Sequence, residues 1–200
     1  MKAIVAATAC VVSAAALPCF SAEKVDASGA AVTFTAANAE IVVRPDAEPV
    51  VRFAAKEAKT FLSEVLGAEV PVVNAPSDGK ASLVLGSNAW ADGAGLSTNA
   101  MERDEFVIAA RGSRVYVLGR DSATVDPEWV LQHGGWSSVL FERSTMFGVY
   151  DFLERFACVR FYFPGELGTV VPKASSVTVR GGVSVKPDFS SRNIGFWTQA

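Results

Sequence analysis

Histidine and cysteine are scarce in this chain of 200 residues, which contains one His and three Cys. A Ser-His-Asp or Cys-His catalytic arrangement would have to use the one histidine, His133, and no G-x-S-x-G pattern surrounds any serine. So few imidazole and thiol ligands also argue against a structural zinc site. We therefore predict no metal site, and a hydrolase built on His133 is kept only as a rival interpretation.

Nucleotide-binding motifs and basic clusters are absent as well. The chain has no P-loop, and the glycines of "GSNAWADGAG" lack the spacing of a dinucleotide-binding turn. The 18 Lys and Arg residues nearly balance the 21 Asp and Glu residues, and the aromatic side chains alternate with aliphatic rather than basic ones. These patterns predict no cofactor and no nucleic-acid partner.

The first 22 residues differ in composition from the rest. Lys2 is followed by an alanine-rich apolar run from Ala3 to Leu17, which is too short to span a bilayer comfortably, and small residues suited to cleavage follow. This pattern predicts a secretory signal peptide over residues 1–22. We therefore expect a secreted or periplasmic protein with no transmembrane segment after signal removal. A buried N-terminal helix and a lipid anchor at Cys19 are the alternatives.

Removal of this segment would also remove Cys10 and Cys19. The mature chain would keep only Cys158, so it would form no internal disulfide and would depend on its core for stability. Hydrophobic residues make up 50% of the chain, which suffices for one domain, or one domain plus a fragment of another. Cys158 follows large apolar residues, and we expect a buried, unreactive thiol.

The order of elements predicts an α+β fold, in which a mixed β-sheet carries two main helices on one face. An apolar stripe predicts the first helix over residues 50–66, with Asp46 as its cap and Gly67 at its end. Residues 27–31 are expected to form a linker, and residues 120–144 a long irregular segment. Strands are expected on both sides of residues 36–38, in a sheet interior at 70–73 and 82–86, in a hairpin of 106–110 and 114–119, and at 159–163. Another strand, with a turn, is expected within 175–185.

The second main helix is expected over residues 146–157, with Ser144 or Thr145 as its cap, within the dense stretch "MFGVYDFLERFACVRFYFPGELG". Its charged residues Asp151, Glu154 and Arg155 share one narrow polar arc, so we interpret them as a solvated face in which Asp151 pairs with Arg155. Arg160 is expected to pair with a helix carboxylate or to form part of a domain interface. A catalytic acid pair needs two carboxylates that face each other across a substrate, roughly 5–10 Å apart, and neighbours on one helix cannot do so. Gly148 is expected to permit close backbone packing.

Four segments follow one another along the chain and together carry a resemblance: "SLVLG", "DEFVIAARGSRVYVLGR", "FGVYDFLERFACVRFYFPGELGTVVPK" and "KPDFSSRNIGFW". Over roughly residues 30–192 this order resembles the N-terminal domain of family 67 α-glucuronidases. It is also similar to the N-terminal domains of family 20 β-hexosaminidases and of large secreted bacterial proteins of unassigned activity. The resemblance implies a two-layer α/β domain that precedes a (β/α)₈ barrel.

In those families the domain is not catalytic, and the barrel carries the reacting groups. The resemblance therefore implies a signal peptide at 1–22, an α/β domain at 23–186 and the start of a truncated barrel at 187–200. It also implies a partner, the downstream barrel of the same polypeptide, and a carbohydrate substrate. In "PDFSSR", Arg192 matches an arginine that contacts sugar in family 20, although Asn193 follows it where the family has glycine. An arginine that bridges the two domains is the alternative.

Taken together, the sequence predicts a non-catalytic N-terminal domain of a secreted bacterial glycoside hydrolase, α-glucuronidase-like or hexosaminidase-like, active in polysaccharide degradation. No residue of this chain is predicted to be catalytic. The alternative is a secreted carbohydrate-binding or scaffold module without an enzyme, in which Trp129 and Trp136 would stack on sugar rings.

Overall fold

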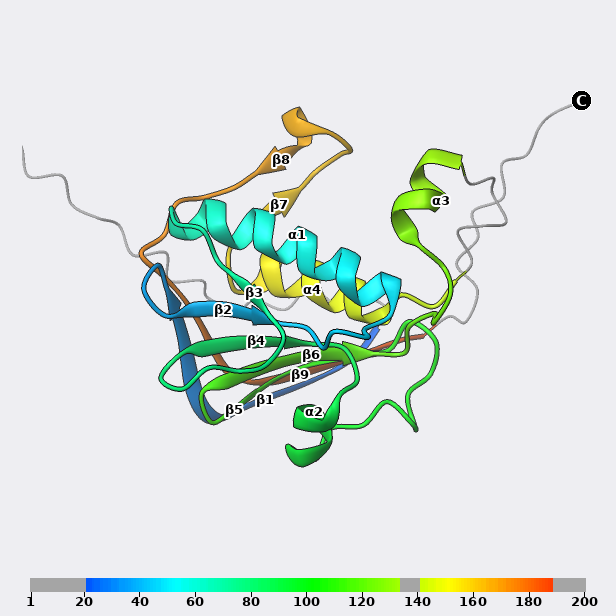
Figure 1. The fold of residues 1–200 in the computed structure, drawn as a ribbon, viewed down its shortest axis with the longest axis horizontal. Coiled ribbons are helices and arrows are strands. Elements are labelled where there is room, and N and C mark those ends of the chain that lie inside the picture. The colour runs from blue at the N-terminus through cyan, green and yellow to red at the C-terminus, as the bar shows by residue number, and fades with distance from the viewer. Residues whose placement is uncertain (1–20, 134–140, 189–200) are drawn as a thin grey trace, which may run out of the picture.

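The computed structural model describes residues 21–133 and 141–188. They form a mixed seven-stranded sheet that carries two long helices on one face (Figure 1). The strands of this sheet, in chain order, are β1 (Ser21–Thr35), β2 (Ala39–Val42), β3 (Val72–Val73), β4 (Ala81–Leu85), β5 (Phe106–Arg111), β6 (Arg114–Gly119) and β9 (Ser176–Pro187). This architecture confirms the predicted α+β class.

The order of strands across the sheet is β1-β9-β5-β6-β4-β2-β3. β2 pairs in parallel with β3 and β4, and β4 pairs in parallel with β6. β5, β9 and β1 complete the sheet through antiparallel pairs. The parallel half requires a crossover, and helix α1 (Pro49–Leu66) provides it between β2 and β3.

The long helices α1 and α4 (Ser144–Arg155) pack against each other, and their apolar sides cover the sheet (Figure 1). The short helix α2 (Ala89–Gly93) lies on the opposite face, where Ala91 joins a small apolar cluster with Val84 and Tyr116. Side chains buried between the sheet and the long helices form the main core, including Phe34, Ile41, Leu62, Leu83, Ile108, Phe152 and Leu153.

The predicted course of α1 is largely confirmed. Ala54, Ala58 and Leu62 are buried on its inner stripe. Gly67 follows the helix at φ 67° and donates its N–H to the carbonyl of Glu64, as a glycine after a helix commonly does. The predicted cap is wrong, because the N-cap residue is Glu48. Asp46 lies two residues before it and pairs with Arg44.

Gly148 allows α4 to approach the sheet closely, as predicted. A Cβ atom at this position would lie 2.6 Å from Cγ1 of Val117 and 3.2 Å from Cδ2 of Phe106, side chains of β6 and β5. The helix begins at Ser144 and ends at Arg155, two residues earlier at each end than predicted. Neither Ser144 nor Thr145 is its N-cap residue, which is Arg143.

The strand predicted at residues 159–163 is mostly wrong. Only β7 (Arg160–Phe161) forms, and it pairs with β8 (Thr169–Val170) in a separate two-stranded sheet. The chain leaves α4 through Cys158, whose φ of 57° turns the backbone away from the main sheet. We call residues 160–170, which include the 3₁₀ turn η2 (Glu166–Gly168), the β7–β8 arm. Cys158 is partly exposed rather than fully buried.

Three further expectations need correction. Residues 27–31 form no linker but belong to β1, which shifts its register against β9 between Asp26 and Ala31. The strand with a turn predicted within 175–185 is one continuous strand, β9, and Gly181 at φ 71° lies beside the register shift. Of residues 70–73, only Val72 and Val73 pair, as a partly exposed edge strand rather than an interior one.

Candidate functional site

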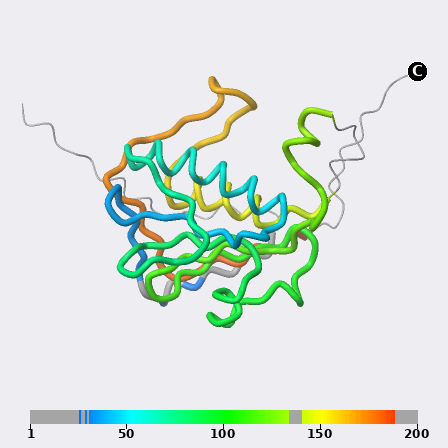
Figure 2. The backbone as a smooth tube through the Cα atoms, viewed as in Figure 1, coloured from blue at the N-terminus to red at the C-terminus, as the bar shows by residue number. Residues whose placement is uncertain are grey.

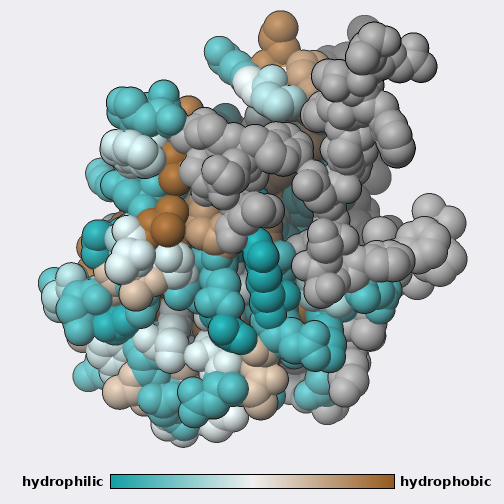
Figure 3. Space-filling model, turned by 90° about the vertical axis from the view of Figure 1, so that its right-hand side faces the viewer, coloured by the Kyte–Doolittle hydropathy of each residue, from teal (hydrophilic) through white to brown (hydrophobic). Residues whose placement is uncertain are grey.

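Two elements project from the helical layer on the side away from the sheet. One is the β7–β8 arm and the other is helix α3 (Pro127–His133), which formed no part of the predicted elements (Figure 2). Among the described residues, the large exposed hydrophobic side chains other than Val72 lie on these two projections. They are Trp129, Leu131, Tyr162, Phe163, Leu167 and Val170. In a view from the side on which α3 lies, hydrophobic atoms are visible at the top, at the height of the arm, and also at the middle left (Figure 3).

A groove of about 630 Å³ lies between the arm and the two long helices. Two carboxylates, Glu57 of α1 and Glu154 of α4, line it. Its remaining lining is mostly aromatic and comes from both helices and the arm: Phe61, Tyr150, Phe161, Tyr162 and Phe163, with Pro164, Gly165 and Thr169. We call it the aromatic–acidic groove.

Three of the rings in the groove are joined by edge-to-face contacts with Phe161 at the centre. The ring centroid of Phe161 lies 5.1 Å from that of Phe61 and 5.2 Å from that of Tyr150, with interplanar angles of 82° and 89°. The hydroxyl of Tyr150 donates a hydrogen bond of 2.7 Å to Oε2 of Glu57. Burial, together with this bond to a carboxylate, raises the pKa of Tyr150 well above its usual value, so the phenol stays protonated.

A second polar site lies at the carboxyl end of β6, where the chain enters the 120–143 segment. Oδ1 of Asp121 accepts the backbone N–H of Thr145 at 3.0 Å. The hydroxyl oxygen of Thr145 in turn accepts the N–H of Gly119 at 3.2 Å. These bonds join the end of β6 to the first turn of α4, so a distant residue satisfies a helix N–H that the predicted local cap does not.

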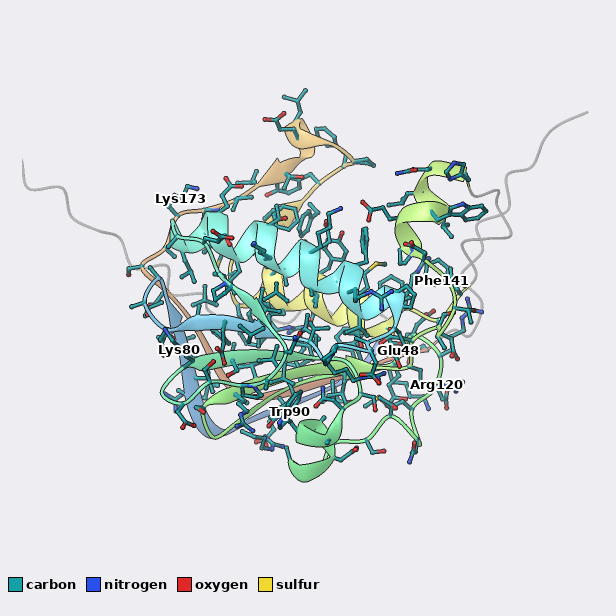
Figure 4. The ribbon with its side chains drawn as sticks, in the orientation of Figure 1. Glu48, Lys80, Trp90, Arg120, Phe141 and Lys173 are labelled. Atoms are coloured by element: carbon teal, nitrogen blue, oxygen red, sulfur yellow. The ribbon has the colours of Figure 1, made fainter. Side chains whose placement is uncertain are left out.

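The pKa of Asp121 is raised to about 7, chiefly by burial. The hydrogen bonds from Thr145 oppose this shift, and the charges of Glu48 and Glu142 add to it. Glu48 and Arg120 lie at this end of the molecule (Figure 4). Arg120 forms an ion pair of 2.7 Å with Glu142, so the surrounding charges are paired with one another. We interpret Asp121 as a structural residue that fixes the start of the segment carrying α3 to the first turn of α4.

The charged residues of α4 behave largely as predicted. Nε of Arg155 lies 3.1 Å from Oδ2 of Asp151, which confirms the predicted pair. Arg160, for which a helix carboxylate was one expected partner, instead donates to the backbone carbonyl of Glu154 at 2.6 Å and to that of Val159 at 2.8 Å. It therefore satisfies a carbonyl in the last turn of α4.

His133 lies at the end of α3 and is exposed. Its ring stacks on Trp129 with centroids 5.2 Å apart, and its Nδ1 lies 3.2 Å from the carbonyl oxygen of Trp129. These contacts join it to no nucleophile, so they give the rival hydrolase interpretation no support. Trp136 and Arg192, the latter a candidate sugar contact, lie outside the described residues.

Within residues 21–133 and 141–188, no group of three or more His, Cys, Asp or Glu side chains is placed to hold a metal ion. None of the helices in this described part of the chain is long and apolar enough to cross a membrane. Residues 1–20, which hold most of the predicted signal peptide, lie outside the structure's description.

No protein-family model matches this chain. No curated protein matches it either. Solved structures that are similar to it include glycoside hydrolases. One is a family GH115 4-O-methyl-α-glucuronidase with specificity for decorated arabinogalactans, at 12% identity and a TM-score of 0.48 over 76% of this chain and 18% of that enzyme.

Two others belong to family GH20. The β-N-acetylhexosaminidase of Streptomyces coelicolor A3(2) is 14% identical, with a TM-score of 0.46 over 82% of this chain and 25% of that enzyme. The exo-β-N-acetylglucosaminidase of Vibrio harveyi is 9% identical, with a TM-score of 0.42 over 85% of this chain and 18% of that enzyme. This chain therefore spans a quarter or less of each of these enzymes.

Proposed function

We propose that this chain is the non-catalytic N-terminal domain of a secreted glycoside hydrolase and that its helical layer packs against a barrel that follows in the same polypeptide. The proposed hydrolase is α-glucuronidase-like or hexosaminidase-like, and the whole protein would act on a carbohydrate. The order of the four sequence segments, from "SLVLG" to "KPDFSSRNIGFW", supports this assignment.

The observation that carries the proposal is the placement of exposed apolar side chains on two projections beside the helical layer. Leu167 is 93% exposed and Tyr162 71% exposed on the arm, and Leu131 is 77% exposed on α3. Burial of such a side chain contributes about 1.5–3 kcal/mol, so a partner that covers both projections would gain several such contributions. Large exposed apolar groups that gather in this way mark interaction surfaces.

Beside the groove, α1 carries exposed charged residues, which fits contact between domains of one chain. Lys56 of α1 forms an ion pair with Glu128 of α3, and Lys59 forms one with Glu69. Interfaces between domains are commonly more polar than the interior of a domain. The proposed interface therefore has apolar contacts on the projections and charged residues on α1.

The charged residues of α4 form no catalytic pair on this surface. Asp151 and Glu154 lie on one helix, and the first is paired with Arg155. Glycoside hydrolysis needs carboxylates on opposite sides of the scissile bond. Catalysis is therefore assigned to the proposed barrel.

The DNA that follows codon 200 tests this proposal directly. We expect an open frame of about 250 residues or more with alternating strand and helix patterns. In the longer protein, the double substitution Leu167→Ser and Tyr162→Ser should weaken the contact between domains and separate one thermal unfolding transition into two. An immediate stop codon, or a transition that these substitutions leave unchanged, would contradict the proposal.

A stand-alone carbohydrate-binding module is the second candidate. The observation in its favour is the exposed indole of Trp129, which is stacked on His133 and is 57% exposed. Glycan binding by the isolated chain, abolished by Trp129→Ala together with Trp136→Ala, would support this candidate. An isolated chain that binds no glycan would dispose of it.

A further inference from the structure

The aromatic–acidic groove has the composition of a receptor for an organic cation. The ring of Phe161 contacts those of Phe61 and Tyr150 within it, and Tyr162 and Phe163 add side chains that are 71% and 58% exposed. The face of an aromatic ring carries negative electrostatic potential, so a set of rings attracts a positive group. The aromatic side chains alone would equally suit an apolar ligand. The polar side chains of the lining therefore determine which class of ligand the groove fits.

The polar side chains of the groove mainly accept hydrogen bonds. Tyr150 donates its hydroxyl hydrogen to Oε2 of Glu57, which leaves Oε1 to accept another bond. The hydroxyl of Thr169 donates to the carbonyl of Gly165 at 3.1 Å. Glu154 adds a second carboxylate. Among the side chains that line the groove, only the hydroxyl of Tyr162 remains to donate to a ligand.

Basic side chains near the groove are engaged elsewhere. Lys56 pairs with Glu128 and Arg155 pairs with Asp151. Arg160 donates to backbone carbonyls. Within residues 21–133 and 141–188, neither Glu57 nor Glu154 takes part in an ion pair. The charge of Lys56 acts on Glu57 from a distance, but Lys56 itself is bonded to Glu128. The groove therefore combines aromatic rings with two carboxylates that form no direct ion pair in the described part of the chain.

These features discriminate between ligand classes. A uronic acid or a phosphate would be repelled by the two carboxylates. A neutral sugar presents both donors and acceptors, and a groove with one free side-chain donor satisfies only part of them. An ammonium or guanidinium group carries donors alone, so it matches both the charge and the hydrogen-bonding capacity of the groove.

We propose that the aromatic–acidic groove receives a basic side chain, arginine in preference to lysine, from the protein surface that packs on the helical layer. Arginine is preferred because its planar guanidinium stacks on aromatic rings while its N–H groups bind carboxylates. This inference rests on the proposed function, since it names the chemistry that the partner domain presents between the two projections.

A binding experiment on the isolated chain tests the groove without the partner. N-acetylarginine amide is titrated into the labelled protein, and amide NMR shifts are followed in the arm and around Glu57 and Tyr150. N-acetylcitrulline amide, a neutral molecule of nearly the same shape, is the matched probe. We expect saturable shifts in the groove with the arginine amide and a Kd at least about tenfold weaker with the citrulline amide, because charge-assisted bonds are roughly twice as strong as neutral ones.

Two substitutions locate the effect. Glu57→Gln keeps an oxygen that accepts the hydroxyl of Tyr150, and Glu154→Gln removes the other negative charge. Each should weaken the binding of the arginine amide by about threefold or more. Glu64→Gln is the matched control, because Glu64 is an exposed acid two turns further along α1 and does not line the groove. It should leave the Kd unchanged.

The outcomes separate this inference from the proposed function. Equal shifts with both probes, or shifts elsewhere on the protein, would overturn the cation site. Saturable groove shifts with N-acetylglucosamine or glucuronate in place of the arginine amide would also overturn it and identify a sugar site. An immediate stop after codon 200 would remove the proposed barrel but would leave a measured arginine site intact.

Discussion

The hydroxyl of Tyr150 donates a 2.7 Å hydrogen bond to Oε2 of Glu57 and thereby links α4 to α1. The two residues are 93 positions apart in the sequence, so the bond closes a long loop of chain. It is part buried and borders the aromatic–acidic groove. The contact therefore serves both the packing of the helices and the proposed cation site.

Tyr150→Phe should lower the free energy of unfolding by about 1 kcal/mol, because one part-buried hydrogen bond to a charged acceptor is lost while the ring remains. Urea denaturation followed by circular dichroism measures the change. Tyr162→Phe is the control, since the ring of Tyr162 is exposed and no hydrogen bond of its hydroxyl is observed. Equal effects of the two substitutions would show that the bond to Glu57 contributes nothing.

Gly148→Ala should destabilise the protein by about 1–3 kcal/mol, although alanine favours a helix over glycine by about 1 kcal/mol. The added Cβ would lie 2.6 Å from Cγ1 of buried Val117, so the helix or the strand must shift. Gly93→Ala is the matched control at the end of α2, where an added Cβ meets nothing within 4 Å. A stabilised Gly148→Ala variant in urea denaturation would contradict the close packing.

Asp121 should make stability depend on pH. Burial raises its pKa from 3.8 to about 7, so the folded protein holds a proton that the unfolded chain releases. The stabilising contribution is present below about pH 4 and is lost as the pH rises through about 7. Asp121→Asn keeps an oxygen for the N–H of Thr145 but does not titrate.

The free energy of unfolding of the Asp121→Asn variant should therefore fall less between about pH 5 and about pH 8 than that of the parent. Denaturant titrations at a series of pH values give both curves. Parallel curves for the two proteins would mean that Asp121 titrates near its ordinary pKa in the folded state.

Purified residues 23–200 should not turn over aryl glycosides or aryl glucuronides. The charged residues of α4 share one helix, and their geometry does not bracket a glycosidic bond. Release of the chromophore above the rate of a blank would contradict this expectation. In that case His133→Ala would show whether the exposed imidazole is responsible.

Local signals made much of the sheet and both long helices predictable. The hairpin of β5 and β6 follows from two β-branched runs around Gly112, which adopts φ 62° in the turn. The first helix follows from its apolar stripe and from Gly67. In each case neighbouring residues contain the whole pattern.

The β7–β8 arm was not predictable in this way. The alternation in "VRFYF" indicates two faces of a strand but does not say what covers either face. Val159 still packs in the core, whereas Phe163 is 58% exposed, because β7 pairs with β8 in a separate sheet rather than with the main one. Helix α3 is seven residues long, too short to show a clear period.

The aromatic–acidic groove and the contact of Asp121 with Thr145 could not be predicted from the sequence, for another reason. Glu57 and Tyr150 meet only because α1 and α4 pack side by side, and Asp121 reaches Thr145 from 24 residues away. The sequence around Glu57 or Asp121 does not indicate which distant residue each of them contacts. Contacts of this range depend on topology, which composition and periodicity do not specify.

The position of β9 has a consequence for the growing chain. β1 lies at the edge of the sheet and pairs with β9, the last strand, which separates it from β5. A nascent polypeptide that ends at β6 can already join its hairpin and its parallel strands, yet its first strand has no neighbour to bond. β9 therefore completes the sheet, and we expect the two ends of the domain to stay unpaired during folding until residues 176–187 join it.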